Sequence, residues 1–437
     1  MKWLVASGQW LVKSVESGVW SARTAAGNVS DRFLRVEFAL LFALCSLLFA
    51  VIVGCSPSIE RTGIPPAPDV VGGQTVNPLV VATIASAFGG VERNDQGVVV
   101  GVDLAQARSS VNDGVLNAAL TIGGLTKLRV AGSGISRETL VKIAEQTKLE
   151  ELFLQDTVVE DDDLAMILTA LPNLKRLTLR RCPNMTDQVA ESFRATNLRN
   201  LALIEMNISH ATLEALAGSS SITALDLRDC SRLAPEDYAL LAGMPQLVDL
   251  KIGGFGINDV VLERISQLPN LAGLTVDDAM ISPGGFVRML ETSAWKNKLT
   301  MLVLNRNTML FDAGLSPIQN LPKLKRLTIN GMMVTGTFLE KLAEDESTRP
   351  KLETLSLRKT LLTVDGAKAL QHYRELKSLD LSGVAMTEEL VESIVTLDTL
   401  ETLNLTECRL TDEMVKPIRN MPNVKSLDLV GNPISDT

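Results

Sequence analysis

Apolar residues recur along most of the chain in one fixed pattern. Leucine, or less often isoleucine or valine, fills the apolar positions of a Leu-x-x-Leu-x-Leu phrase such as "LETLNL" at 400–405. The phrase begins at thirteen points that lie 24 to 28 residues apart, namely Leu125, Leu149, Leu174, Leu198, Ile222, Leu247, Leu271, Leu299, Leu324, Leu352, Leu376, Leu400 and Val424. A weaker copy in phase begins at Val99. Periods of this length are typical of solenoids, in which each repeat forms one coil.

Within each repeat the pattern changes from strand-like to helix-like. Apolar residues alternate in "TLNL" at 402–405, and alternation predicts a short strand. A Thr then precedes acidic residues in "TDEM" at 411–414, which predicts a helix N-terminus with negative charge at its positive end. The helix ends near "MPN", because proline stops it. We therefore predict an α/β solenoid, a curved horseshoe with a parallel sheet on its concave face and helices on its convex face.

These phrases resemble the leucine-rich-repeat superfamily over residues 99–437. Cys182, Cys230 and Cys408 stand at the ninth position of their repeats, and Asn307 and Asn432 take it in two others. This pattern is most similar to the cysteine-containing and ribonuclease-inhibitor-like classes. Residues 80–104 resemble the amino-terminal cap of bacterial proteins of this kind, with a short helix and two strands joined at "NDQG". The resemblance implies a scaffold that binds other proteins.

The segments before the repeats differ in composition. We expect a basic leader at 1–37, a hydrophobic signal or transmembrane segment at 38–55, a Pro/Gly-rich linker at 56–78, an N-terminal cap at 79–98 and a domain of about 13–14 repeats at 99–437. Residues 3–20 allow either a helix on a membrane surface or a leader without a fixed fold.

The hydrophobic segment predicts a membrane location. The run "FALLFALCSLLFAVIVG" at 38–54 carries no charge and has about the length that a spanning helix requires, at least ~17 residues. Basic residues precede it, which favours a cytoplasmic N-terminus and a body outside the cytoplasm, on the periplasmic or cell-surface side. The run ends in "IVGC", which resembles a bacterial lipobox, so Cys55 is the predicted lipidation site. A cleaved lipoprotein and an uncleaved transmembrane anchor both remain open.

Charge and chemistry narrow the classes of function. The net charge is −9, and an acidic chain argues against a nucleic-acid partner, because phosphate binding needs a basic surface. The chain's two histidines, His210 and His372, lie six repeats apart, so no catalytic or metal site forms from both. Cysteines on separate strands are too far apart to bridge, so we expect buried free thiols. We predict no metal, no cofactor and no enzyme activity.

Candidate binding residues lie between the leucines of the strands, on the concave face. Arg176, Arg180, Arg181 and Arg228 cluster in repeats three to five, bordered by Phe153, Asp226 and Asp229. Such a patch predicts binding of an acidic protein loop or a glycan. The alternative is a solvated row of weak charge pairs. Repeats seven and nine carry extra residues at 291–298 and 344–350, which makes Trp295 a further candidate.

The sequence thus predicts a membrane-tethered, extracytoplasmic protein-interaction module. One alternative is a substrate-recognition arm like that of the F-box leucine-rich-repeat proteins, which needs an adaptor-binding helical domain that residues 1–98 do not supply. An enzyme would need a convergent site that the sequence does not reveal. No closing cap follows the last repeat, so we also expect self-association through its unpaired edge strand.

Overall fold

The structure is a computed structural model, and it describes residues 3–6, 9–13, 20–23, 69–71, 74–107, 111–194 and 196–435. The chain divides into two units, Met1–Ala67 and Pro68–Thr437. In the first unit β1 (Trp3–Ala6), β2 (Gln9–Lys13) and β3 (Trp20–Arg23) form an antiparallel sheet. The surface helix considered for 3–20 is therefore wrong. The physical reason is that Trp and Val favour strands. The predicted hydrophobic segment at 38–55, with Cys55, lies outside the described residues.

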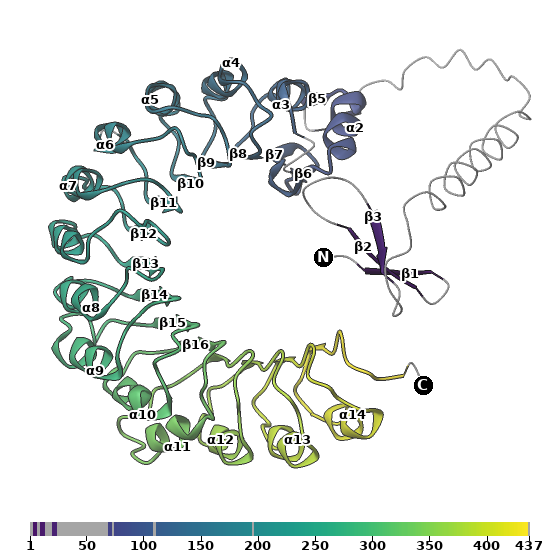
Figure 1. Cartoon of the computed structure of the whole chain (residues 1–437), viewed down its shortest axis with the longest axis vertical. Coiled ribbons are helices and arrows are strands. Elements are labelled where there is room, and N and C mark those ends of the chain that lie inside the picture. Colours follow the sequence, from purple (N-terminus) through teal and green to yellow (C-terminus); the bar gives the residue numbers. More distant parts are fainter. Residues whose placement is uncertain are drawn as a thin grey trace, which may run out of the picture. The chain divides into compact units, whose positions relative to one another are not determined.

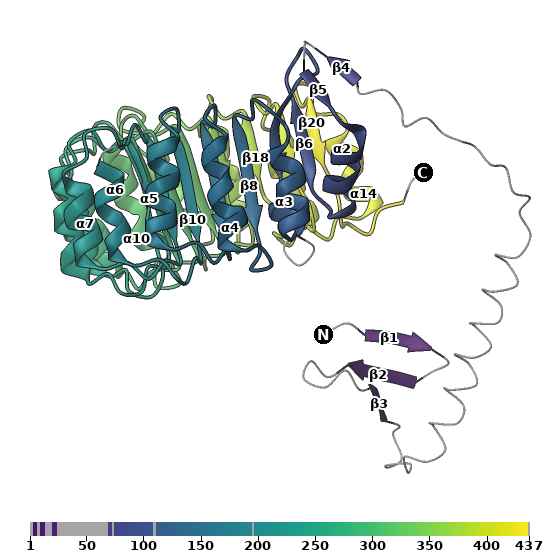
Figure 2. The same cartoon turned by 90° about the horizontal axis from the view of Figure 1, so that it is seen from above.

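The second unit confirms the predicted α/β solenoid (Figure 1). Its sheet of fifteen strands lines the inner side of an arc, and the helices follow one another along the outer side (Figures 1 and 2). The strands are β6 (Gly90–Arg93), β7 (Val99–Asp103), β8 (Lys127–Ala131), β9 (Glu151–Gln155), β10 (Arg176–Arg180), β11 (Asn200–Ile204), β12 (Ala224–Asp226), β13 (Asp249–Gly253), β14 (Gly273–Asp277), β15 (Met301–Asn305), β16 (Arg326–Asn330), β17 (Thr354–Ser356), β18 (Ser378–Asp380), β19 (Thr402–Asn404) and β20 (Ser426–Asp428).

The helices of successive repeats lie on the convex side. The α-helices are α3 (Asp113–Leu120), α4 (Arg137–Leu140), α5 (Asp161–Ala170), α6 (Ala190–Arg194), α7 (His210–Ala217), α8 (Asp259–Ser266), α9 (Pro283–Thr292), α10 (Asp312–Leu315), α11 (Thr337–Ala343), α12 (Val364–Ala369), α13 (Glu388–Val395) and α14 (Asp412–Ile418). The 3-10 helices are η1 (Ala105–Ala107), η2 (Val141–Glu145), η3 (Asp187–Val189), η4 (Pro235–Gly243), η5 (Ser316–Asn320) and η6 (Leu370–His372).

The leucines hold the strands in one register. Leu177 lies opposite Leu152 on one side and Leu201 on the other, and the column continues through Leu225 and Leu250. Each of these side chains is at most 1% exposed. Burying a leucine side chain stabilises a fold by about 1.5–3 kcal/mol, and no single coil could bury its own column. The column therefore forces the parallel pairing that runs from β7 to β20.

Residues before the first full repeat cover its open side. Helix α2 (Pro78–Ser86) begins at Asn77, whose side chain accepts a hydrogen bond from the Leu79 N–H. Strands β6 and β7 form an antiparallel hairpin with its turn after Asn94. Two further strands, β4 (Asp69–Val71) and β5 (Gln74–Val76), pair within the segment predicted as a linker.

Aspartates at helix N-termini join each helix to the next repeat. Asp187 accepts hydrogen bonds from the Ser209 N–H and hydroxyl, both at 2.7 Å, and from the buried Thr212 hydroxyl at 2.6 Å. The same bonds to an N-cap Ser or Thr one repeat later are made by Asp113, Asp161 and Asp259, and the equivalent bonds to Thr335 and Ser435 are made by Asp312 and Asp412. Asp113, Asp161, Asp187 and Asp259 thus each stabilise two helices, their own through the dipole and that of the next repeat through direct bonds to its N-cap residue.

Where the first helical residue is Arg or His instead of Asp, the aspartate of the contact belongs to the next repeat. Arg137 binds Asp163 of the next repeat through Nε at 2.8 Å, and His210 lies 2.8 Å from Asp237. Both aspartates also accept the backbone N–H of their own N-cap residue, at 3.0 Å for Asp163 and 2.8 Å for Asp237. The hydrogen bond with Asp237 raises the pKa of His210, and the hydrogen bonds from Arg137 lower the pKa of Asp163.

We predict that Asp187→Ala lowers the free energy of unfolding by about 2 kcal/mol, because it leaves the Thr212 hydroxyl buried without its acceptor. Chemical denaturation measures the loss. Asp162→Ala is the matched control, since Asp162 also lies in the first turn of a helix but is exposed, and it changes stability by less than about 0.5 kcal/mol.

We predict that the free energy of unfolding of native protein exceeds that of Asp187→Asn at neutral pH, and that this difference falls as the pH is lowered. Burial raises the pKa of Asp187, but hydrogen bonds from Thr212 and Ser209 outweigh burial, and the net pKa is lowered. The carboxylate therefore contributes stability above its unfolded pKa of about 3.9, and that contribution disappears as pH falls through the folded value. A stability difference that stays constant from pH 7 to pH 3 would contradict this role.

Candidate functional site

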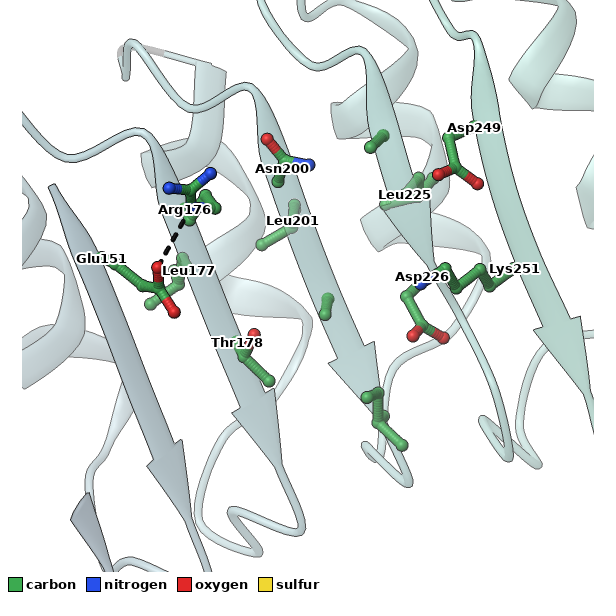
Figure 3. Close-up of a pocket in the computed structure, with 13 residues that line it drawn as sticks. Glu151, Arg176, Leu177, Thr178, Asn200, Leu201, Leu225, Asp226, Asp249 and Lys251 are labelled. Atoms are coloured by element: carbon green, nitrogen blue, oxygen red, sulfur yellow. Dashed lines mark hydrogen bonds and ion pairs between the residues drawn. The ribbon is translucent and has the colours of Figure 1, made fainter. Parts of the chain in front are cut away.

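The concave face is hollowed across β10 to β13 (Figure 3). The hollow has a volume of about 230 Å³. Its centre is open because Ala202 and Ala224 stand where other strands carry longer side chains. Sequence reasoning missed it, although two alanines among charged strand positions were a readable signal.

Charged side chains of both signs border the hollow (Figure 3). On one side Arg176 pairs with Glu151 at 3.1 Å, and on the other lie Asp226, Asp249 and Lys251. Oxygen Oδ1 of Asp249 is buried and has no hydrogen-bond donor among the described residues. The hollow can therefore hold a chain that presents both a positive and a negative group, together with a small apolar surface at its centre.

The predicted arginine cluster is neutralised by carboxylates. Arg180 binds Glu205 at 2.6 Å, and Arg181 lies between Asp156, at 2.6 Å, and the same Glu205, at 3.0 Å. Burial raises the pKa of Glu205, but the hydrogen bonds from both arginines outweigh it and the net pKa is lowered. The structure thus brings the arginines together as members of ion pairs, as in the alternative of a charge-pair row, and only Arg176 borders the hollow.

Arg228 neutralises two buried carboxylates. Its Nη2 donates to Asp226 at 2.7 Å, and its Nη1 donates to Asp277, two strands further along, at 3.2 Å. Asp226 is 8% exposed and Asp277 is 6% exposed. Asn305 also donates to Asp277, at 2.7 Å. These contacts fix the strand ends beside the hollow, and they use the hydrogen-bonding capacity that we had expected Arg228 to offer a partner.

The remaining candidate residues lie apart from the hollow. Phe153 stacks under the guanidinium of Arg129, with 4.1 Å from that carbon to the ring centroid. Asp229 lies in the turn after β12, on the edge of the sheet. Trp295 is fully buried and donates its indole N–H to the Ile265 carbonyl at 2.9 Å, so it offers no surface to a partner.

The cysteines of the repeats are structural. Cys182, Cys230 and Cys408 are buried free thiols. Cys230 donates to the Leu203 carbonyl at 2.9 Å, and Cys408 donates to the Leu381 carbonyl at 3.2 Å. Burial raises the pKa of Cys230 to about 12 and that of Cys408 to about 11, so both stay protonated near neutral pH. Within the described ranges no group of three or more His, Cys, Asp or Glu is placed to hold a metal ion.

The turn after each strand places one residue in the left-handed region of φ. Arg181, Glu205, Asp229, Asp278, Arg306 and Lys359 all have φ between 48° and 60° there. Each backbone N–H donates to the end of the next strand, as from Asp229 to the Gly253 carbonyl at 3.0 Å. Glycine takes the position in other repeats, and at Gly254 a Cβ atom would lie 2.9 Å from the Asp229 carboxylate. Glycine here makes room for the charged side chain of the preceding repeat.

Comparisons with known proteins agree with this architecture. The repeats have the fold of a leucine-rich-repeat solenoid, and the family model described as Leucine Rich repeat matches residues 397–418 and 420–437. The chain is 25% identical to the putative RNA-binding protein EEED8.10 of Caenorhabditis elegans over 48% of this chain and 30% of that protein. It is 28% identical to the DNA repair protein rhp7 of Schizosaccharomyces pombe over 58% of this chain and 47% of that protein. The chain thus spans less than half the length of either curated relative.

Two solved structures are similar to this chain at low sequence identity. An internalin from Listeria monocytogenes matches with 18% identity and a TM-score of 0.38, over 82% of this chain and 90% of the internalin. TLR13 in complex with ssRNA13 matches with 16% identity and a TM-score of 0.46, over 72% of this chain and 54% of TLR13.

The predicted membrane-anchored, extracytoplasmic location is contradicted. In the parts of the chain that the structure describes, no helix is both long enough and apolar enough to cross a membrane. The curated relatives are named as an RNA-binding protein and a DNA repair protein. The prediction rested on one uncharged run and the lipobox-like "IVGC", which lie outside the described residues.

We predict that Arg228→Met lowers the free energy of unfolding by about 3 kcal/mol, because it leaves two buried carboxylates without their cation. Adding Asp277→Asn restores part of the loss. Arg176→Met, which breaks one ion pair of an exposed arginine on the same face, costs less than about 1 kcal/mol. Urea denaturation of the variants measures these differences. Equal losses for the two arginine variants would show that Arg228 has no special role.

Proposed function

We propose that the protein is a protein-interaction module that binds a segment of a partner protein in the concave hollow between β10 and β13. The single observation that carries the proposal is the hollow itself, where small side chains leave space between charged rims of both signs. At the strand ends beside the hollow, Arg180 is paired with Glu205 and Arg228 with Asp226, so these arginines are already engaged.

Charge composition favours a polypeptide over a nucleic acid at this site. Arg176 and Lys251 at the rims are balanced by Glu151, Asp226 and Asp249, which gives two cations against three anions. A phosphate backbone needs a clear excess of cations, whereas a peptide carries charges of both signs. Because one relative is named as a putative RNA-binding protein, RNA is the competing ligand that the experiment has to test.

Oxygen Oδ1 of Asp249 is an acceptor to which a partner can donate a hydrogen bond. A buried acceptor without a donor costs about 1–3 kcal/mol, and a peptide N–H or a lysine reaching it would recover that free energy. A recognition module without catalysis also fits the protonated thiols and the charge pairs, none of which forms a nucleophile–base pair.

We further propose that the repeats belong to the cysteine-containing class, because the thiols fill the ninth position and bond the preceding strand.

Proximity labelling tests the proposal, with a labelling enzyme fused to the full chain in its native cells. We predict that Arg176→Glu combined with Lys251→Glu reduces labelling of specific partner proteins at least threefold, because both rims change charge. Lys341→Glu combined with Lys368→Glu makes the same change of charge on the convex helices α11 and α12, and it leaves labelling unchanged.

Two results would contradict the proposal. One is partner labelling that survives the concave variant. The other is ultraviolet crosslinking that captures RNA on native protein and loses it with the same concave variant.

A further inference from the structure

Exposed apolar side chains form a strip along one edge of the solenoid. They are Phe255 (84% exposed), Met280 (49%), Met309 (43%), Phe311 (52%), Met333 (57%) and Leu361 (53%). Each lies in the loop between a strand and the following helix, in the five consecutive repeats from β13 to β17. The strands are parallel, so these loops share one edge, and Met280 and Leu361 each donate a backbone hydrogen bond to the loop of the preceding repeat. We call these six residues the apolar strip.

The strip is a local feature of the described edge. Met280, Met333 and Leu361 occupy the tenth position of their repeats. Five other repeats carry Pro183, Asn207, Ser231, Ala385 and Arg409 there, and Val158 at this position of the β9 repeat is only partly exposed. Single exposed apolar residues are ordinary, but a row over successive repeats marks an interaction surface. It lies outside the concave hollow, so it is independent of the proposed function.

The spacing along the strip suits an extended polypeptide. Neighbouring strands lie about 4.8 Å apart, and packed helices lie about 8–10 Å apart. The loops connect these two layers, so their spacing falls between those values. In an extended chain, side chains on one face recur about every 6.7 Å, which is in the same range. A straight helix cannot follow the curve on which these repeats lie, whereas an extended chain can (Figure 1).

An anionic pocket lies at one end of the strip. It has a volume of about 200 Å³ and is lined by Asp229, Leu233, Tyr238, Gly254, Phe255 and other residues of the same loops. No ion pair or side-chain hydrogen bond within the described residues involves the exposed Asp229 carboxylate. Partial burial raises the pKa of Asp229, and the charges of Glu205 and Asp278 raise it further, while Arg228 lowers it. A lysine or arginine of a ligand would be attracted here.

We propose that the apolar strip docks an extended segment of a partner protein, with apolar side chains at alternate positions and a cationic side chain at the end that meets Asp229. The apolar side chains contact Met280, Met333 and Leu361, and the cation pairs with Asp229 beside Phe255. The segment lies across five repeats, so a stretch of about eight to ten residues spans the strip at about 3.3 Å per residue.

A library of random ten-residue peptides, displayed on phage and selected on the full-length protein, tests this proposal. We expect enriched peptides that alternate apolar residues and carry a lysine or arginine at one end. Binding of the synthesised peptides is then measured by fluorescence anisotropy. Met280→Ser combined with Met333→Ser weakens the Kd at least tenfold, and Asp229→Asn weakens it at least threefold.

Met166→Ser is the matched control, because Met166 is 47% exposed on α5, away from the strip, and it leaves the Kd within twofold. Circular dichroism melting shows whether each variant keeps its fold. The proposal is overturned if no peptide is enriched, or if every enriched peptide binds the double serine variant as tightly as native protein. It is also overturned if sedimentation velocity finds native dimers that the double variant abolishes, since the strip would then hold a second copy of the chain.

Discussion

Lateral stacking of leucine columns is the interaction on which every other feature of the repeat unit depends. Leu152, Leu177 and Leu201 lie opposite one another on adjacent strands, and none has more than a trace of exposed surface. A single coil of about two dozen residues cannot bury this column, so each repeat obtains its core from its two neighbours. The register that results places all strand ends at one edge and all helix N-termini beside them. The aspartate caps, the charge pairs and the apolar strip are consequences of that alignment.

The polar contacts between coils recur with the same period as the leucines. Many side chains meet a partner 22 to 28 residues away, as Asp187 meets Ser209 and Asp277 meets Asn305. Such bonds tie neighbouring coils more than they tie residues within a coil. They also leave few charged groups free on the concave face, since Arg180, Arg181 and Arg228 are all engaged. We therefore propose that partners bind where charge pairing is less complete, at the hollow and at the edge beside Asp229.

The sequence predicted the solenoid because leucine spacing determines both the strands and their stacking. It did not predict which arginines are free, because pairing depends on side chains one or two coils away that the linear pattern does not distinguish. Trp295 illustrates a second limit. Its insertion looked like a surface bulge, yet the added residues carry the indole into the core. The hollow was predictable in principle from Ala202 and Ala224, and the strip from Met and Phe in successive loops, but the predicted binding residues came only from the strands, the turn at Asp229 and the insertions of repeats seven and nine.

Hydrogen exchange measured by mass spectrometry on the full-length protein tests most directly whether one continuous core underlies these features. The account predicts slow exchange of backbone amides in all strands from β8 to β19. It also predicts that Leu201→Ala, which opens a cavity in the centre of the column, speeds exchange in the strands on both sides, β10 and β12. Exchange that increased only within the mutated repeat, or strands that were unprotected in native protein, would show that the coils do not share a core.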